Sequence, residues 1–304
     1  MISHIYAPPY YKNFECIKGA CRHTCCAGWR IGIDTDTLSL YETMEGDLGH
    51  TVRKWIETDE DGAYIPLTEC GRCPHLDEDG LCRIISALGN EAVSEICREH
   101  PRFYNSAGDR LEVGIGMSCE AAAELILSSD EYFPAICVGE CDAENAECEF
   151  IRERDRMLEM LADKSTEYRD KLILLINKYQ IPKDILFGER WRKTFNELEY
   201  KTDESAKLFT SAISNGTFGR DELLERFLAY MIYRHVTAAE SYTDMRARLS
   251  FCLLSAAVLE SMTVSSGADT LDEVAELARI YSDEIEYSED NTDALIFEIE
   301  CEII

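Results

Sequence analysis

The pattern of apolar and polar positions divides the chain into two halves of different texture. Residues 150–304 carry apolar side chains at the i, i+3, i+4 spacing of helices that bury one face. The helices predicted there are Arg152–Tyr179, Asp221–Ala239, Asp244–Met262 and Leu271–Tyr287. This half shows no sustained alternation of apolar and polar residues, which is the pattern of a half-buried strand. The chain is therefore predicted to be mainly α.

The first half has shorter segments and most of the glycines and prolines. Its predicted helices are Thr37–Leu48 (capped by Thr35 or Asp36, with Arg53–Thr58 as a continuation), residues 82–98 and residues 118–129. Thr68–Leu81 is rich in Gly and Asp, which is typical of a loop. We therefore expect two domains, a Cys-rich domain with many loops over residues 1–149 and a helical domain over residues 150–304.

Charge narrows the range of partners. The chain has 304 residues, with 30 Lys and Arg against 59 Asp and Glu, so its net charge is −29. A surface this acidic repels phosphates, so nucleic acid is not an expected partner. It attracts cationic partners such as a lysine-rich protein segment, although solubility alone also explains acidity of this kind.

The N-terminus and the cysteine content bear on the compartment. Residues 1–15 lack the basic and apolar regions of a signal peptide. The longest apolar runs, Leu172–Ile176 and Phe251–Leu259, are too short to span a bilayer, so no membrane is expected. We therefore expect a cytoplasmic protein. In a reducing cytoplasm, dense cysteines are more often metal ligands than disulfides or unrelated buried thiols.

Cysteines crowd into the first half of the chain. Of the fourteen, twelve precede residue 150. One group is Cys16-x4-Cys21-x3-Cys25-Cys26, and a second is Cys70-x2-Cys73-Pro74 followed by Cys82 and Cys97. A Cys-x2-Cys turn lets two thiolates reach one metal, and four thiolates hold either zinc or a 4Fe–4S cluster. The sequence predicts a metal centre, with zinc and iron–sulfur both left open.

Three further features of the cysteines qualify this prediction. Neighbouring side chains diverge, so Cys25 and Cys26 are not expected to bind the same metal; one ligates and the other packs, or they face separate centres. The group Cys137-x3-Cys141-x6-Cys148 has no Cys-x2-Cys and is a weaker candidate. The spacing also differs from the Cys-x3-Cys-x2-Cys of radical enzymes that cleave S-adenosylmethionine.

Three stretches resemble the flagellin lysine-N-methylase (FliB) family. They are residues 14–34 (FECIKGACRHTCCAGWRIGID), 73–105 (CPHLDEDGLCRIISALGNEAVSEICREHPRFYN) and 111–127 (LEVGIGMSCEAAAELIL). A wider group of cysteine-cluster proteins, described as zinc- or iron-chelating, is also similar. The likeness covers roughly the first 130 residues, and the helical second half matches only in length and texture.

The resemblance implies a protein-lysine N-methyltransferase. It implies transfer of a methyl group from S-adenosylmethionine to lysines of flagellin by a protein that holds a 4Fe–4S cluster. The alternative is a metal-chelating or redox protein, with iron–sulfur or zinc, that transfers nothing. A third hypothesis is a zinc-stapled module whose acidic face binds a basic partner. The cysteines that match the family pattern, and so become candidate ligands, are Cys16, Cys21, Cys25, Cys26, Cys73, Cys82, Cys97 and Cys119.

No methyl-transfer site follows from the residues themselves. Gly114-Ile115-Gly116 lacks the third glycine of a dinucleotide-binding turn, so we do not expect it to hold a cofactor. A target lysine, with an ordinary pKa of ~10.4, must lose a proton before it attacks a methyl group. His100 is a candidate aid for this step, and Arg102 a candidate contact for a cofactor carboxylate. Trp29 is a candidate for stacking on adenine, although core packing is the commoner role. His23 is a candidate non-Cys ligand.

Overall fold

The computed structural model describes residues 2–107, 110–142, 149–182, 189–211 and 218–303. Within them the chain forms two compact units. The smaller unit is Glu15–Phe103, and the larger combines Met1–Phe14 with Tyr104–Ile304. This division differs from the predicted boundary at 149/150. It arises because the N-terminal segment and the strands after residue 103 pair with one another, so both belong to the helical unit.

The larger unit contains a four-stranded sheet in the order β5-β6-β1-β7. The strands are β1 (Ile2–Ala7), β5 (Arg102–Ala107), β6 (Arg110–Ile115) and β7 (Ile136–Asp142). β1 runs parallel to β6, with Ile5 opposite Leu111, and antiparallel to β7, with Ser3 opposite Cys141. The sheet was not predicted, because it joins short segments more than a hundred residues apart. The prediction of a mainly α fold is nevertheless confirmed, because helices make up most of the described residues.

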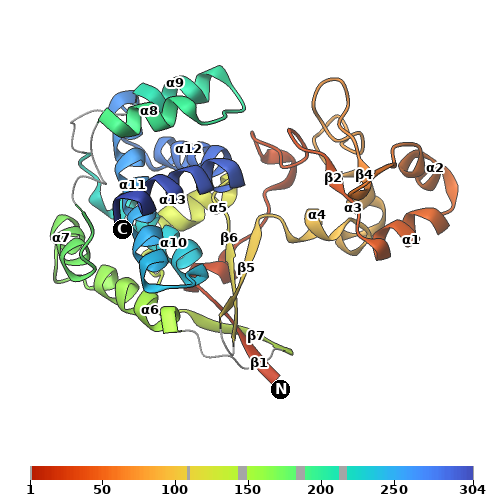
Figure 1. The fold of residues 1–304 in the computed structure, drawn as a ribbon. Helices are drawn as coiled ribbons and strands as arrows, with labels where there is room; N and C mark the ends of the chain where they lie inside the picture. The colour runs from red at the N-terminus through yellow and green to blue at the C-terminus, as the bar shows by residue number, and fades with distance from the viewer. Residues whose placement is uncertain (1, 108–109, 143–148, 183–188, 212–217, 304) are drawn as a thin grey trace. The chain divides into compact units, whose positions relative to one another are not determined.

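Helices form the rest of the larger unit (Figure 1). They are α5 (Glu120–Ser128), α6 (Glu149–Ala162), α7 (Tyr168–Lys178), α8 (Glu189–Glu197), α9 (Asp203–Ser211), α10 (Asp221–His235), α11 (Tyr242–Ser266), α12 (Leu271–Tyr281) and α13 (Glu289–Ile303). The predicted helix at 118–129 is confirmed as α5. The predicted Arg152–Tyr179 is two helices, because the Asp163 carboxylate accepts hydrogen bonds from Ser165 and Thr166 and turns the chain between α6 and α7.

The longest helix, α11, lies in the core of this unit. It packs against α10 and α13, and side chains around most of its circumference are buried. Among the helices of the described residues, α11 alone is long and apolar enough to cross a membrane by length and composition. This corrects the expectation, based on the shorter run Phe251–Leu259, that no segment reaches that length. Of its most apolar window, 67% is buried inside the unit, as in the core helix of a folded domain.

The Cys-rich unit consists of short elements. Its helices are α1 (Thr35–Thr43), α2 (Gly46–Lys54), α3 (Arg83–Leu88) and α4 (Glu95–Glu99), and its small sheet has the order β2-β4-β3, formed by β2 (Ile31–Gly32), β3 (Glu57–Asp59) and β4 (Gly62–Ile65). The helix predicted over 82–98 is interrupted at Gly89, whose φ of 89° suits glycine. The helix predicted over Thr37–Leu48 ends at Thr43, and Asp34, not Thr35 or Asp36, caps its start. Thr68–Leu81 contains no helix or strand, as predicted.

Gly49 limits how closely α1 and α2 approach, because a Cβ at this position would lie 2.2 Å from the Met44 carbonyl oxygen. We expect Gly49→Ala to lower the free energy of unfolding by about 1–3 kcal/mol, since the backbone must move. This cost exceeds the ~1 kcal/mol that alanine gains over glycine in a helix. Urea unfolding followed by circular dichroism measures the change. Gly32→Ala is the control, because nothing lies within 4 Å of its added methyl group; equal stability of both variants would contradict the prediction.

Candidate metal centre

Four thiols from separate segments of the Cys-rich unit meet at its apolar core. Cys73 is buried, and Cys26, Cys82 and Cys97 are half-buried and pack against the same core residues, which include Ile31, Tyr41 and Ile84. We call these four side chains the thiol quartet. They lie close enough to affect one another's ionisation: Cys26, Cys82 and Cys97 all act electrostatically on Cys73, and Cys26 and Cys82 act on Cys97.

Backbone pairing brings the first two thiols of the quartet together. The Cys73 N–H donates to the Cys26 carbonyl at 2.7 Å, and Ala27 pairs with Arg72 in an antiparallel bridge. Gly71, with φ 72°, closes the turn that precedes Cys73, and its carbonyl accepts from the Gly28 N–H. The segments around residues 26 and 73 are thus held side by side, although 47 positions separate them in the chain.

Hydrogen bonds to the carboxylates of Asp77 and Asp34 position the other two thiols, those of Cys82 and Cys97. The Asp77 carboxylate accepts the N–H groups of Asp79 and Leu81, which turns the chain back so that Leu76 pairs with Cys82. Cys82 is the residue that caps α3. Asp34 caps α1 and also accepts the Glu95 N–H at 2.8 Å, which fixes the start of α4 and so places Cys97.

Backbone and side-chain donors surround the sulfurs, but burial dominates their ionisation. The backbone N–H of His75 lowers the pKa of Cys73, and those of Ile84 and Ile85 lower the pKa of Cys82, but burial has the larger effect. Burial raises the pKa of Cys73 to about 12 and that of Cys97 to about 11. Thiols with such pKa values stay protonated at neutral pH unless a cation stabilises the thiolate, as a bound metal does.

The adjacent cysteines have different surroundings, as expected for side chains that diverge. Cys25 is exposed, whereas Cys26 packs on the core. A hydrogen bond from the Cys25 thiol lowers the pKa of Cys26 to about 7, against the opposing effect of burial. Cys26 is therefore the member of the quartet most readily ionised at neutral pH. The Cys25 carbonyl accepts the indole N–H of Trp29 at 2.9 Å, and the Trp29 ring packs against the core.

The other predicted ligands are not among the described residues that pack against this core. Cys16 is exposed, its sulfur accepts the Lys18 N–H, and the Cys21 thiol donates to the His23 carbonyl. Cys119 caps α5 in the larger unit. The quartet thus contains four of the eight cysteines that the resemblance singled out.

The remaining sequence candidates are distributed over several elements of the two units. His100 ends α4, and an Arg102 guanidinium nitrogen lies 3.5 Å from the Arg98 carbonyl oxygen. Cys70 is exposed beside the Thr68 hydroxyl. Cys137 and Cys141 lie in β7 of the larger unit, and Cys148 lies outside the described residues.

The donor chemistry of the quartet fits a thiophilic metal group. Soft thiolates are the ligands that zinc and iron–sulfur clusters take. Among the described residues, no three His, Cys, Asp or Glu side chains already stand in the arrangement that one metal ion needs. Two residues that the sequence did not single out adjoin the quartet: Tyr41, whose buried phenol interacts electrostatically with Cys73, Cys82 and Cys97, and His75. Tyr41 follows the apolar periodicity of its helix, which is a signal for burial but not for proximity to cysteines.

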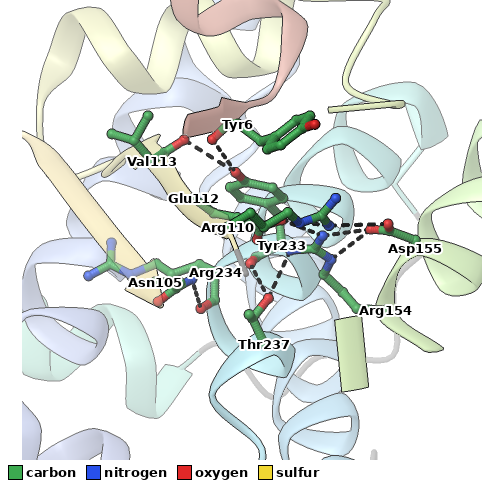
Figure 2. Close-up of polar contacts among 10 residues, drawn as sticks. All are labelled: Tyr6, Asn105, Arg110, Glu112, Val113, Arg154, Asp155, Tyr233, Arg234 and Thr237. Carbon is green, nitrogen blue, oxygen red and sulfur yellow. Dashed lines mark hydrogen bonds and ion pairs between the residues drawn. The ribbon is translucent and has the colours of Figure 1, made fainter. Parts of the chain in front are cut away.

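A buried ion pair links helices to the sheet in the larger unit (Figure 2). The Arg154 side chain is fully buried and binds the Glu112 carboxylate of β6 through both terminal guanidinium nitrogens. The distance from Arg154 Nη2 to Glu112 Oε1 is 2.9 Å. It also donates to Thr237 Oγ1 at 2.8 Å and to Asp155. The Tyr233 hydroxyl bridges the carbonyls of Tyr6 and Val113, on neighbouring strands. This network fastens α6 and α10 to the sheet, and all its members are already paired.

A second buried network in the larger unit centres on Glu286. This residue ends a single π-helical turn, Ser282–Glu286, a geometry that recurs at functional sites. Its carboxylate accepts from the Tyr230 hydroxyl at 3.0 Å and contacts His235 Nε2 at 2.8 Å and Arg234 Nε at 3.3 Å. Burial alone would raise the pKa of Glu286, but Arg234 and His235 lower it to about 2.

The low pKa of Glu286 predicts a loss of stability in acid. Because the folded pKa lies below the ordinary value of 4.5, this carboxylate stabilises the fold fully above about pH 4.5. That contribution is lost as the pH falls from there toward about 2. We expect Glu286→Gln to flatten this part of the stability–pH profile, measured by urea unfolding at successive pH values. Exposed Glu289→Gln should leave the profile unchanged; an unaltered slope in Glu286→Gln would count against the network.

Comparison with known proteins finds similarity to lysine-N-methylases. Two proteins named lysine-N-methylase, from Salmonella choleraesuis and Salmonella typhimurium, are each 28% identical over 130 residues, which is 41% of this chain and 32% of the relative. The flagellar biosynthetic protein FliU of Salmonella muenchen is 28% identical over 139 residues, 44% of this chain and 80% of the relative. The predicted resemblance is confirmed.

The similarity to these relatives is partial. The chain spans about a third of the length of the two lysine-N-methylases. No family model matches the chain, and no solved structure matches it.

Proposed function

We propose that this chain is a protein-lysine N-methyltransferase whose Cys-rich unit holds a 4Fe–4S cluster. The observation that carries the cluster is the thiol quartet, in which Cys26, Cys73, Cys82 and Cys97 reach one core from four segments. Four thiolates are what such a cluster needs from the protein. The names of the relatives support a methyltransferase in general.

The finer parts of the proposal are the methyl donor, the substrate and the compartment. We propose S-adenosylmethionine as the donor and lysines of flagellin as the acceptors, since the relatives are named lysine-N-methylase and flagellar biosynthetic protein. The net charge of −29 favours approach of a lysine-bearing segment. We propose a cytoplasmic location, because in a reducing compartment dense cysteines are more often metal ligands than disulfides.

Each residue of the quartet has a defined task in this proposal. The thiols of Cys73, Cys82 and Cys97 lose their protons to become ligands, which reverses the effect of burial on their pKa. Cys26 ionises first, because the Cys25 thiol already lowers its pKa. The bound cluster would supply redox or electrophilic chemistry; the protein supplies four ligands and an apolar wall that excludes water.

The same donor set also suits zinc, so metal analysis is the first experiment. Protein purified without oxygen is assayed for iron, acid-labile sulfide and zinc, and its absorption spectrum is recorded. About four irons and four sulfides per chain support the cluster. Zinc without sulfide would overturn it and favour a zinc-binding protein without transferase activity.

Methyl transfer is tested separately from metal content. The protein that carries its metal is incubated with labelled S-adenosylmethionine and flagellin, and lysine methylation is read by mass spectrometry. The matched control substrate is flagellin whose lysine amines have been acetylated, which removes the acceptor amines. Methylation of the unmodified protein alone supports the proposal. A protein with iron and sulfide that methylates neither substrate would overturn the flagellin transferase and leave a redox or metal-chelating role.

A further inference from the structure

His75 has a buried imidazole ring for which the described residues supply no hydrogen-bond partner. The residue is 1% exposed, and neither Nδ1 nor Nε2 has a hydrogen-bond partner among the described residues. A buried polar group without a partner costs about 1–3 kcal/mol, and nearly all such groups in folded proteins are paired. The imidazole therefore requires a partner that is not part of this chain's described residues.

Backbone hydrogen bonds place His75 between two members of the quartet. It lies two positions after Cys73, and its carbonyl accepts from the N–H of Arg83, the residue directly after Cys82, at 2.9 Å. Leu76, the next residue, pairs with Cys82 itself. His75 thus belongs to the short segment that connects two thiols of the quartet, and its side chain is buried.

The imidazole ring of His75 carries an N–H group whichever ring nitrogen holds the proton, so it can donate a hydrogen bond to a sulfur. A neutral imidazole carries one N–H donor and one lone pair. Cys26, Cys73, Cys82 and Cys97 already supply four ligands, which leaves the imidazole to act on the bound group from outside its ligand set.

We propose that the His75 imidazole N–H donates a hydrogen bond to a sulfide sulfur of the cluster held by the quartet. This inference rests on the proposed cluster. Hydrogen bonds to cluster sulfurs stabilise the reduced, more negative state and raise the reduction potential. His75 is then a tuning residue of the centre, while the thiols bind the iron.

Reduction potential is the first test. Iron and sulfide are measured in each variant, and the midpoint potential is determined by dye-mediated redox titration without oxygen. We expect His75→Phe, which keeps a buried ring but removes the donor, to retain its iron and to shift the potential to more negative values. His75→Gln keeps an N–H donor and should recover most of the shift. His50→Gln alters an exposed histidine of α2 in the same unit and should leave the potential unchanged.

A measurement on the unaltered protein covers the case in which His75→Phe does not fold. With ¹⁵N-histidine in the reduced protein, pulsed electron paramagnetic resonance should detect one weakly coupled histidine nitrogen near the cluster. A strong coupling typical of an iron ligand, or none, would overturn the hydrogen bond. An unchanged potential in iron-replete His75→Phe would overturn it as well. Absence of sulfide from the unaltered protein overturns both this inference and the cluster, whereas sulfide without a histidine signal overturns this inference alone.

Discussion

Alanine in place of Cys73 is expected to reduce the metal content of the Cys-rich unit to near background. Cys73 is the most buried member of the quartet, and the other three thiols all act on it. Loss of one thiolate leaves an incomplete ligand set. For complete thiolate and imidazole zinc sites the apparent binding free energy is about 10–16 kcal/mol, much of it coupled to folding. Metal analysis after gel filtration, together with the thermal midpoint of unfolding, measures both effects.

Cys70 is the matched control for Cys73. It lies three positions before Cys73 and is exposed. Its sulfur lies 3.1 Å from the Thr68 hydroxyl oxygen. Cys70→Ala and Cys119→Ala should keep their metal, whereas Cys82→Ala and Cys97→Ala should lose it. Equal metal loss in Cys70→Ala and Cys73→Ala would show that the quartet is not the ligand set.

Replacement of Arg154 by methionine is expected to destabilise the larger unit by about 3–5 kcal/mol, because Glu112 is left buried with a weakened set of partners. Arg110 still contacts Glu112 at 2.7 Å, which favours the lower end of this range. Combining Arg154→Met with Glu112→Leu removes both charges and should recover much of the loss. Thermal and urea unfolding followed by circular dichroism measure these differences.

An exposed ion pair on the same helix provides the comparison for Arg154. The Arg156 side chain, 59% exposed, pairs with Glu153 one turn away on α6. Arg156→Met should change stability little, because solvent screens exposed pairs. If Arg154→Met were as stable as Arg156→Met, the buried pair would not be what fastens α6 to the sheet.

Helices of the larger unit follow from local sequence. Apolar residues at helical spacing indicated the segments that became α5, α10, α11 and α12, because one buried face imposes that period on the sequence. Breaks were harder to predict. Three predicted helices are interrupted, at Asp163, at Gly89 and after Thr43. Local hydrogen bonds or a positive φ cause these breaks, and the apolar periodicity of the sequence does not reveal either cause. The four-stranded sheet was missed because its pairing joins residues 2–7 to residues 110–142.

The sequence by itself determined the helical class, the concentration of thiols in the first half of the chain, the excess of negative charge and the likeness to lysine-N-methylases. These depend on composition, short-range periodicity and motif spacing, which the chain carries in linear form. Only the tertiary structure decided which four of eight matching cysteines share a core and where the N-terminal strand belongs. It also showed that the buried His75 imidazole has no hydrogen-bond partner among the described residues. Spacing shows which residue types recur. Which of them meet depends on the backbone pairing of distant segments, such as that of Cys73 with Cys26, and no local pattern encodes it.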